Sequence, residues 1–271
     1  MQSKAITRRR FFETTAIAMA AAGLSRFGFA AGNGLDVGAQ SYSFRNFDLA
    51  GAIEQLKSIG LDTMEFCSVH FPPDATHPDF PQVKAMLAES GIKVPCYGVE
   101  GFGADAAANR KKFEFAKALG VEVLTADVAP EGFDSVEALC EEFGLKIALH
   151  NHGPNARYDK VSDTLDAVEG RSALVGACLD TGHCIRSGEK PDETAAALGD
   201  RLISLHLKDW VHGGKEQTLG EGDLDLVRFC KVLKAQGFNG PTVMEYENHP
   251  DNPAPHMKQG FDNWQAAWHK A

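Results

Sequence analysis

The strongest constraint on this chain is a regular alternation of two kinds of segment, which begins after residue 35. Short apolar or β-branched runs are followed by longer stretches with apolar residues at helical spacing. We expect eight strands, within residues 36–43, 61–67, 93–100, 121–127, 145–153, 174–180, 202–209 and 241–247. We expect helices within residues 49–60, 79–90, 107–120, 134–144, 160–170, 191–200, 225–238 and 256–270.

Eight strand–helix units within residues 32–271 predict an α/β fold of one domain, a (β/α)8 TIM barrel. An open doubly wound sheet also alternates, but it usually begins with a glycine-rich phosphate turn. Here the first strand leads into SYSFRNFD instead. Several helical stretches stop at a glycine before the next strand, which suits left-handed caps, as at Gly60, Gly120, Gly144 and Gly237.

The N-terminal segment, residues 1–31, differs from the rest of the chain. Arg8, Arg9 and Arg10 precede two phenylalanines and a short alanine-rich apolar stretch, which is too short to span a membrane comfortably. This pattern resembles a twin-arginine export signal. We therefore expect residues 1–31 to be removed, residues 32–271 to lie in the periplasm, and the mature protein to make no membrane contact.

The net charge of the chain argues against nucleic acid as a partner. The chain carries a formal net charge of −10, and removal of the basic N-terminal segment, which carries +4, would leave −14. A protein with this much negative charge repels the phosphate backbone of nucleic acids, and nucleic acid is therefore not an expected partner.

None of the six cysteines forms a CxxC pair, so a structural zinc ribbon is not expected. We expect mostly free, buried cysteines, with Cys67 and Cys96 as the pair to check.

Polar residues gather at the predicted carboxyl ends of the strands. A barrel places its functional groups there, because the loops that follow the strands converge on one face. These strand-end residues are Gln40, Glu65, Glu100, Asp127, His150, Asn151, His152, Asp180, His183, His206, Lys208 and Glu245.

Four of them carry ligand chemistry on consecutive strands, the fifth to the eighth, and these four are His150, Asp180, His206 and Glu245. Side chains alternate along a strand, and each of the four follows an apolar residue assigned to the outer face, so all four are expected to face the lumen. Two imidazoles and two carboxylates suit a divalent ion such as Mn, Co, Fe or Zn. The alternative is a set of rim residues that hydrogen-bond to one another.

The motifs ALHNHG, LDTGH, LHLKD and VMEYE occur in this order at strand spacing. In them the chain resembles the xylose-isomerase-like TIM barrels, over roughly residues 35–270. That superfamily groups sugar-phosphate isomerases and epimerases, ketose 3-epimerases, inosose dehydratases and AP endonucleases. The resemblance implies metal ligands at Asp180, His206 and Glu245, a substrate or supporting contact at His183, and a rim lysine at Lys208.

The chain departs from the ketose epimerases at one ligand. They carry a glutamate at the end of the fifth strand, and two glutamates move a proton on opposite faces of the substrate. Here His150 takes that place, so only Glu245 of the pair remains. With two carboxylates a divalent centre is formally neutral, which leaves the ion a stronger Lewis acid than a third carboxylate would.

These features predict a metal-dependent enzyme that enolises a keto-sugar or sugar derivative, with isomerase or epimerase chemistry as the main interpretation. The alternative is a lyase that cleaves 3-keto-glycosides, supplied by a partner oxidoreductase, or dehydrates a keto-polyol. The expected catalytic residues are Glu245, His183, His152 and Lys208. The expected substrate contacts are Glu65, Glu100, Asn151 and Glu221.

Two further classes are weighed against these. An AP endonuclease needs a three-metal cluster with many more histidines than this rim supplies. A non-catalytic sugar-binding barrel would keep the polar rim but would bind no metal tightly. In every case other than the nuclease the expected ligand is a small sugar or glycoside.

Overall fold

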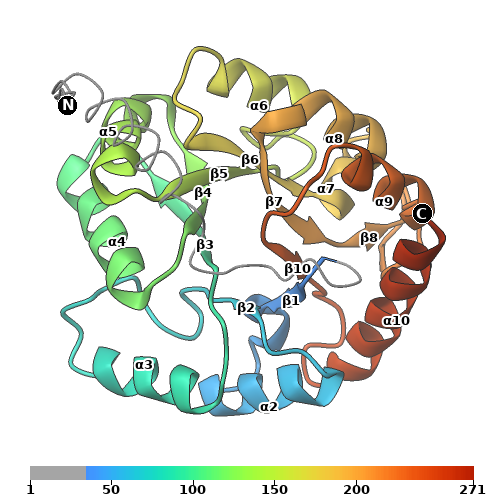
Figure 1. Cartoon of the computed structure of the whole chain (residues 1–271), viewed down its shortest axis with the longest axis horizontal. Helices are drawn as coiled ribbons and strands as arrows, with labels where there is room; N and C mark the ends of the chain where they lie inside the picture. Colours follow the sequence, from blue (N-terminus) through green and yellow to red (C-terminus); the bar gives the residue numbers. More distant parts are fainter. Residues whose placement is uncertain (1–34) are drawn as a thin grey trace, which may run out of the picture. The chain divides into compact units, whose positions relative to one another are not determined.

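The expected barrel is confirmed in a computed structural model, which describes residues 35–271 (Figure 1). The predicted export signal lies outside the described residues, so it stays a prediction. The strands are β1 (Val37–Gln40), β2 (Met64–Glu65), β3 (Cys96–Phe102), β4 (Val123–Val128), β5 (Lys146–His150), β6 (Val175–Asp180), β7 (Leu202–Leu207) and β10 (Thr242–Met244).

All neighbouring strands of the barrel run parallel, in the order β2-β1-β10-β7-β6-β5-β4-β3. Two isolated parallel bridges close the ring between β2 and β3, one from Thr63 to Lys93 and one from Phe66 to Tyr97. Because every strand points the same way, all eight carboxyl ends lie on one rim.

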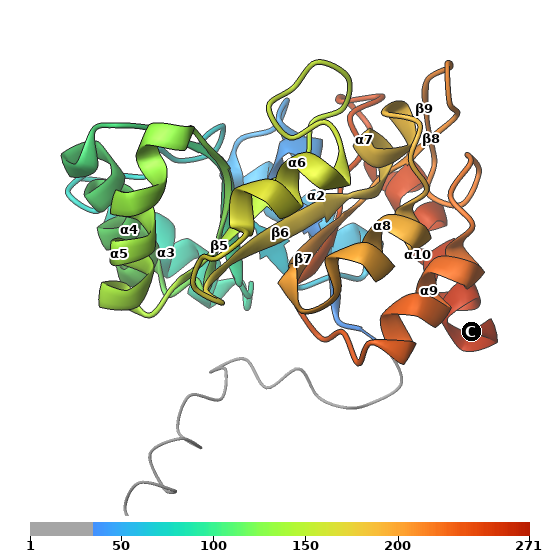
Figure 2. The ribbon, with the colours of Figure 1, turned by 90° about the horizontal axis from the view of Figure 1, so that it is seen from above.

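Helices cover the outside of the barrel, as Figures 1 and 2 show from two directions. They are α2 (Leu49–Ile59), α3 (Phe80–Glu89), α4 (Ala106–Leu119), α5 (Phe133–Phe143), α6 (Val161–Val168), α7 (Thr181–Arg186), α8 (Pro191–Leu198), α9 (Leu226–Ala235) and α10 (Ala254–Lys270). Short 3-10 turns occupy Ser41–Phe44, Pro130–Gly132 and Gly199–Arg201. The expected glycine caps hold at Gly60, Gly120 and Gly144, each of which ends its helix with a positive φ.

Two elements differ from the expectation. The six-residue helix α7 begins directly after β6, in a segment for which no helix was expected. A small antiparallel hairpin, β8 (Asp209–Trp210) with β9 (Glu216–Gln217), follows β7. Both additions lie beyond the carboxyl ends of strands, beside the predicted site.

The hydrophobic core lies mainly between the strands and the helix layer. A second, smaller cluster of buried residues on the strands consists of Cys96, Val123, Ala148, Cys178 and Ile203. All six cysteines are free and buried, as expected, and Cys67 and Cys96 form no disulfide.

Among residues 35–271, no helix has the length and hydropathy needed to cross a membrane.

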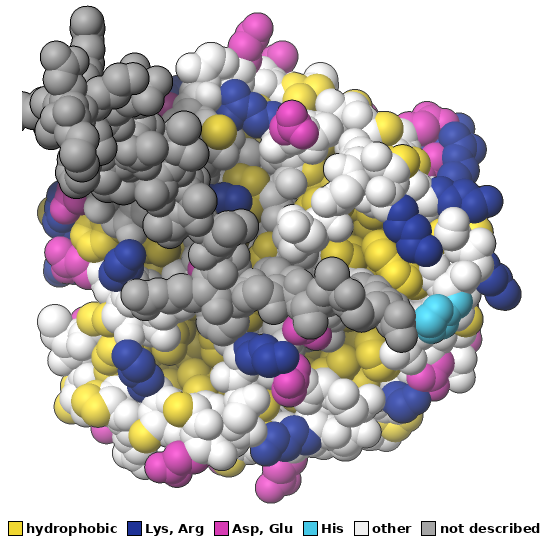
Figure 3. All heavy atoms as spheres, viewed as in Figure 1, with side chains coloured by type: hydrophobic (Ala, Val, Ile, Leu, Met, Phe, Trp, Pro, Cys, Tyr) yellow, Lys and Arg dark blue, Asp and Glu magenta, His cyan; other side chains and the backbone are white. Residues whose placement is uncertain are grey.

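Figure 3 shows one face of the molecule as spheres, and on it Lys and Arg side chains are interspersed with Asp and Glu side chains. The visible charges are therefore mixed in sign over the drawn part of the surface.

Candidate metal centre

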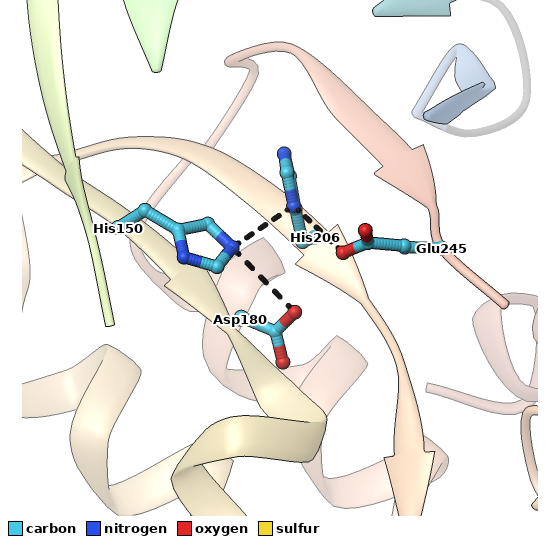
Figure 4. A group of neighbouring side chains, drawn as sticks. All are labelled: His150, Asp180, His206 and Glu245. Atoms are coloured by element: carbon cyan, nitrogen blue, oxygen red, sulfur yellow. Dashed lines mark hydrogen bonds and ion pairs between the residues drawn. The ribbon is translucent and has the colours of Figure 1, made fainter. Parts of the chain in front are cut away.

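The ends of β5, β6 and β7 and the residue after β10 bring four side chains together. Figure 4 shows His150, Asp180, His206 and Glu245 pointing toward one another. One ligand atom from each lies within 4.8 Å of the others. His206 Nδ1 is 3.1 Å from His150 Nε2 and 3.2 Å from Glu245 Oε2. The predicted convergence of the four side chains is confirmed.

Asp180 divides its carboxylate between two tasks. Oδ1 accepts the backbone N–H of His183 at 2.7 Å, which caps the first turn of α7. Oδ2 is fully buried and has no hydrogen-bond partner within residues 35–271. It faces His150 Nε2 at 3.6 Å. A buried carboxylate oxygen without a donor is costly unless a cation lies beside it, so Oδ2 fits a metal ligand.

The two imidazoles lead to the same conclusion. His206 Nε2 faces a carboxylate oxygen of Glu65 at 2.9 Å, so Nε2 carries the hydrogen and Nδ1 presents a lone pair to His150. Burial lowers the pKa of His150 to about 3, so His150 is neutral. Two facing ring nitrogens 3.1 Å apart require a proton or a cation between them.

The pKa of His206 also shows that the surroundings of this ring favour a positive charge. Burial alone would lower this pKa, but Cys178, Glu65 and Glu245 raise it well above its usual value. A divalent ion would supply that charge without a proton. The donor set of two imidazoles and two carboxylates therefore fits a divalent transition metal.

Glu65 lies behind His206 rather than beside the pocket. Its side chain is 1% exposed, and its Oε2 holds His206 Nε2–H. A carboxylate in this place fixes the tautomer and ring orientation of a metal-binding histidine. This position favours support of His206 over the predicted substrate contact.

Lys208 is the buried counter-charge of the cluster. Its Nζ lies 3.3 Å from Glu245 Oε2 and 3.9 Å from Asp180 Oδ2, and it also bonds Glu247. Burial alone would lower the Lys208 pKa, but these three carboxylates raise it above its usual value, so the ammonium is charged. The lysine stem crosses Gly182, where an added Cβ would lie 2.5 Å from Lys208 Cγ. The glycine of LDTGH is therefore needed for Lys208 to reach the cluster.

A cavity of about 430 Å³ opens above the cluster. His150 and Glu245 line it, together with His152, His183 and Arg186. The rings of His152 and His183 lie 5.5 Å apart, centroid to centroid. The cavity therefore brings together three of the four predicted catalytic residues, Glu245, His183 and His152, whereas Lys208 does not line it.

Three predicted substrate contacts lie elsewhere. Asn151 is buried and exchanges two hydrogen bonds with the Asp180 backbone, so it fixes the end of β6 against β5. Glu100 pairs with Lys112 of α4 at 2.8 Å, so its carboxylate faces the helix layer. Glu221 is exposed on the loop after the β8–β9 hairpin and does not line the cavity. These placements do not favour substrate contacts.

Sequence reasoning missed Arg186 and assigned no role to Glu247, which it placed in the strand expected within residues 241–247. Arg186 ends α7, and its Nη1 lies 2.7 Å from His183 Nδ1. Its spacing of three residues from His183 would have indicated the contact, had the LDTGH segment been recognised as the start of a helix. Glu247 follows two residues after Glu245, so strand alternation could have placed both on the same side.

Comparisons with known proteins agree with this architecture. The family model described as "Xylose isomerase-like TIM barrel" matches residues 53–267. An inosose dehydratase of Clostridium perfringens is 25% identical over 224 residues, which cover 72% of this chain and 73% of that protein.

Two solved structures share the fold. An uncharacterised protein from Parabacteroides distasonis is 26% identical, with a TM-score of 0.68 over 86% of this chain and 98% of that one. The IolI protein, whose crystal structure holds a zinc atom, is 17% identical, with a TM-score of 0.70 over 87% of this chain and 99% of that one.

Proposed function

Because the chain belongs to the xylose isomerase-like TIM-barrel family, we propose that it is a divalent-metal-dependent lyase acting on a keto-polyol or a 3-keto-glycoside. The reaction is a β-elimination, in which a C–H bond next to a ketone breaks and water or an alkoxide leaves from the neighbouring carbon. The observation that carries the proposal is the composition of the cavity wall: one metal-site carboxylate, Glu245, faces imidazoles where a second carboxylate would serve an epimerase.

The relatives support this choice over the isomerase or epimerase interpretation. The similar protein from Clostridium perfringens is named an inosose dehydratase, and a dehydratase is a lyase. A cation held by His150, Asp180, His206 and Glu245 would polarise the ketone and stabilise the enolate charge. The remaining requirements are a base for the α-proton and an acid for the leaving oxygen.

Glu245 is placed to act as the base. Its Oε2 pairs with Lys208 Nζ at 3.3 Å and lies 3.2 Å from His206 Nδ1. Its Oε1 makes no hydrogen bond within the described part of the chain, and Glu245 lines the cavity. Oε1 is therefore available to receive the α-proton. Burial alone would raise the pKa of Glu245, but Lys208 and His206 hold it below its usual value, so the carboxylate is ionised.

His183 is placed to act as the acid. Burial holds the pKa of its ring below the usual value, so the ring is neutral. Arg186 Nη1 donates to His183 Nδ1, which leaves the hydrogen on Nε2. That proton passes to the departing oxygen as the C–O bond breaks. The products are an unsaturated ketone and water or a free aglycone. The α-proton is then on Glu245, and His183, left as an imidazolate beside Arg186, regains a proton from Glu245 before the next turnover.

Lys208 and His152 complete the proposal. Lys208 balances Glu245 and Asp180, and His152 lines the cavity as a contact for substrate oxygens. The proposed location is the periplasm, reached through the twin-arginine segment. That location favours a free sugar acid, sugar or glycoside over a phosphorylated metabolite as substrate.

The decisive test uses a chromogenic 3-keto-glycoside in deuterated water. We expect the manganese-loaded protein to release the aglycone, and Glu245→Gln to abolish release. Glu100→Gln is the matched control, because Glu100 faces α4, and it should retain the rate. Deuterium uptake into an intact ketose, without release of a leaving group, would contradict the lyase and support an isomerase or epimerase.

A further inference from the structure

Arg186 is the unmatched positive charge on the wall of the cavity. Its guanidinium donates to His183 Nδ1 at 2.7 Å and lies over the Trp210 ring, 4.9 Å from the centroid. No carboxylate oxygen within residues 35–271 lies within 4.0 Å of it. The proposed elimination requires the divalent ion but does not by itself require a second positive charge, such as the Arg186 guanidinium, on the cavity wall.

The other described arginines are differently placed. Four of them pair with carboxylates, and these are Arg110, Arg157, Arg171 and Arg228. Arg45 and Arg201 donate to backbone carbonyls. Arg186 instead contacts an imidazole and an aromatic face, so most of its five N–H donors are left for a ligand.

The two carboxylates that line the cavity, Glu245 and Glu247, already have other partners. Glu245 and Glu247 both pair with Lys208. A divalent ion would balance Asp180 and Glu245, which together carry −2. After these pairings Arg186 remains with a full positive charge facing the cavity. Arg186 therefore has no carboxylate partner of its own among residues 35–271, and a carboxylate of the substrate can supply one.

The guanidinium is also held in place before any ligand binds. His183 fixes one edge, Trp210 covers a face, and Gly153 lies close enough that an added Cβ would be 3.6 Å from Arg186 atoms. A pre-positioned arginine loses less conformational entropy on binding, and its planar fork matches a carboxylate with two parallel hydrogen bonds. A single guanidinium matches a monoanionic carboxylate better than a phosphate dianion.

We propose that the cavity binds a keto-sugar acid, and that Arg186 holds its carboxylate and so determines substrate specificity. This inference rests on the proposed lyase and names its substrate class. Arg186 also orients His183, so loss of Arg186 slows any substrate. Carboxylate binding is therefore measured as the ratio of two affinities, that for a sugar acid divided by that for the matching neutral sugar. A general loss of activity does not change this ratio.

The test measures binding of D-glucuronate and D-glucose to the purified metal-loaded protein by calorimetry. The two ligands differ only in a carboxylate in place of a hydroxymethyl group. We expect glucuronate to bind at least about tenfold more tightly than glucose, and Arg186→Gln to bring the ratio close to one. Arg157→Gln is the matched control, because Arg157 also lies near the rim but pairs with Asp127, and it should keep the wild-type ratio.

Two further arms keep the test decisive. Glucose 6-phosphate distinguishes a carboxylate site from a phosphate site, and tighter binding of the phosphate ester than of glucuronate would overturn the proposal. If Arg186→Gln does not fold, Arg186→Lys keeps the charge without the fork, and we expect it to reduce the ratio while remaining above one. Failure of wild type to prefer glucuronate, or an unchanged ratio in either variant, overturns the proposal.

The two proposals fail separately. Aglycone release from a neutral 3-keto-glycoside without any preference for glucuronate would overturn only the role of Arg186. A clear preference for glucuronate, lost in Arg186→Gln, without elimination from any keto-sugar would leave the carboxylate site in place and overturn the lyase.

Discussion

The two halves of the barrel rim carry similar residue types but use them differently. In the first half, Glu100 and Asp127 lie near the ends of β3 and β4. They pair with Lys112 and Arg157, outside the cluster. In the second half, Asp180 and Glu245 lie at or just after the ends of β6 and β10, and both face the shared centre. A carboxylate at a strand end is therefore a candidate ligand only when its side chain faces the lumen.

Glu65 joins the two halves. It ends β2 in the first half, but its carboxylate reaches across the lumen to His206 on β7. The first half thus supplies support for ligands that the second half provides. Substitutions in the two halves should therefore differ in their effects on metal binding and activity.

Asp180→Asn should abolish activity while keeping the fold. The amide oxygen can still accept the His183 N–H and cap α7, but the charge and one ligand oxygen are lost. We expect the elimination rate to fall about 1000-fold or more and the metal content to fall with it. Metal analysis by mass spectrometry and the aglycone-release assay measure both. Asp127→Asn, at the end of β4, should change neither, and equal effects of the two variants would remove the distinction between the halves.

Lys208→Met should destabilise the protein strongly. It leaves the buried carboxylates of Glu245 and Asp180 without their ammonium partner, at a cost of about 3–5 kcal/mol in the free energy of unfolding. Added manganese should restore part of this loss, because a cation bound only to the folded state stabilises it. Urea unfolding with and without the metal measures both. The matched variant Lys112→Met should cost far less, about 1 kcal/mol or below, and no difference between the two would contradict the account.

Glu65→Gln tests the supporting role of the first half. Loss of the carboxylate that holds His206 Nε2–H should weaken metal affinity about 10- to 100-fold. A competition titration with a chelating dye measures this. Glu100→Gln should leave the affinity unchanged, because Glu100 faces α4. An unchanged affinity in Glu65→Gln would show that Glu65 does not orient the ligand.

The smallest expected effect concerns Glu216, which lies in the β8–β9 hairpin. Its carboxylate accepts the backbone N–H groups of Glu247 and Asn248, so it holds the loop after β10. Burial raises the pKa of Glu216 to about 7. A raised folded-state pKa gives stability that is complete below the ordinary pKa, near 4.5, and is lost as the pH rises through about 7.

Glu216→Gln should remove this pH dependence. Relative to the variant, wild type should lose on the order of 1 kcal/mol between pH 5 and pH 8. Thermal melts of both proteins across this range measure the difference. Parallel stability curves for the two proteins would contradict the expected shift.

Most of the fold follows from local patterns in the sequence. Alternation of apolar strands and amphipathic helices fixed the number and order of the units, and glycines at 60, 120 and 144 marked three helix ends. The short helix α7 was not predicted, because Thr181 and Gly182 are as compatible with a turn as with a helix start. Its cap becomes visible only when Asp180 is seen to accept from His183.

The four candidate ligands were predictable because strand alternation and strand order are sufficient to place them. The residues that hold these ligands in place were not predictable. Glu65 and His206 are 141 residues apart, and the outward orientation of Glu100 depends on Lys112 of a neighbouring helix. The unmatched charge of Arg186 becomes evident only because no carboxylate among residues 35–271 lies near it in space, and sequence order does not encode that.

The most direct test of the shared centre is anomalous diffraction from crystals of the manganese-loaded protein. The account predicts one strong peak about 2.0–2.3 Å from ligand atoms of His150, Asp180, His206 and Glu245. A map with no peak among them, or with the metal bound elsewhere while the four side chains bond only to one another, would contradict it.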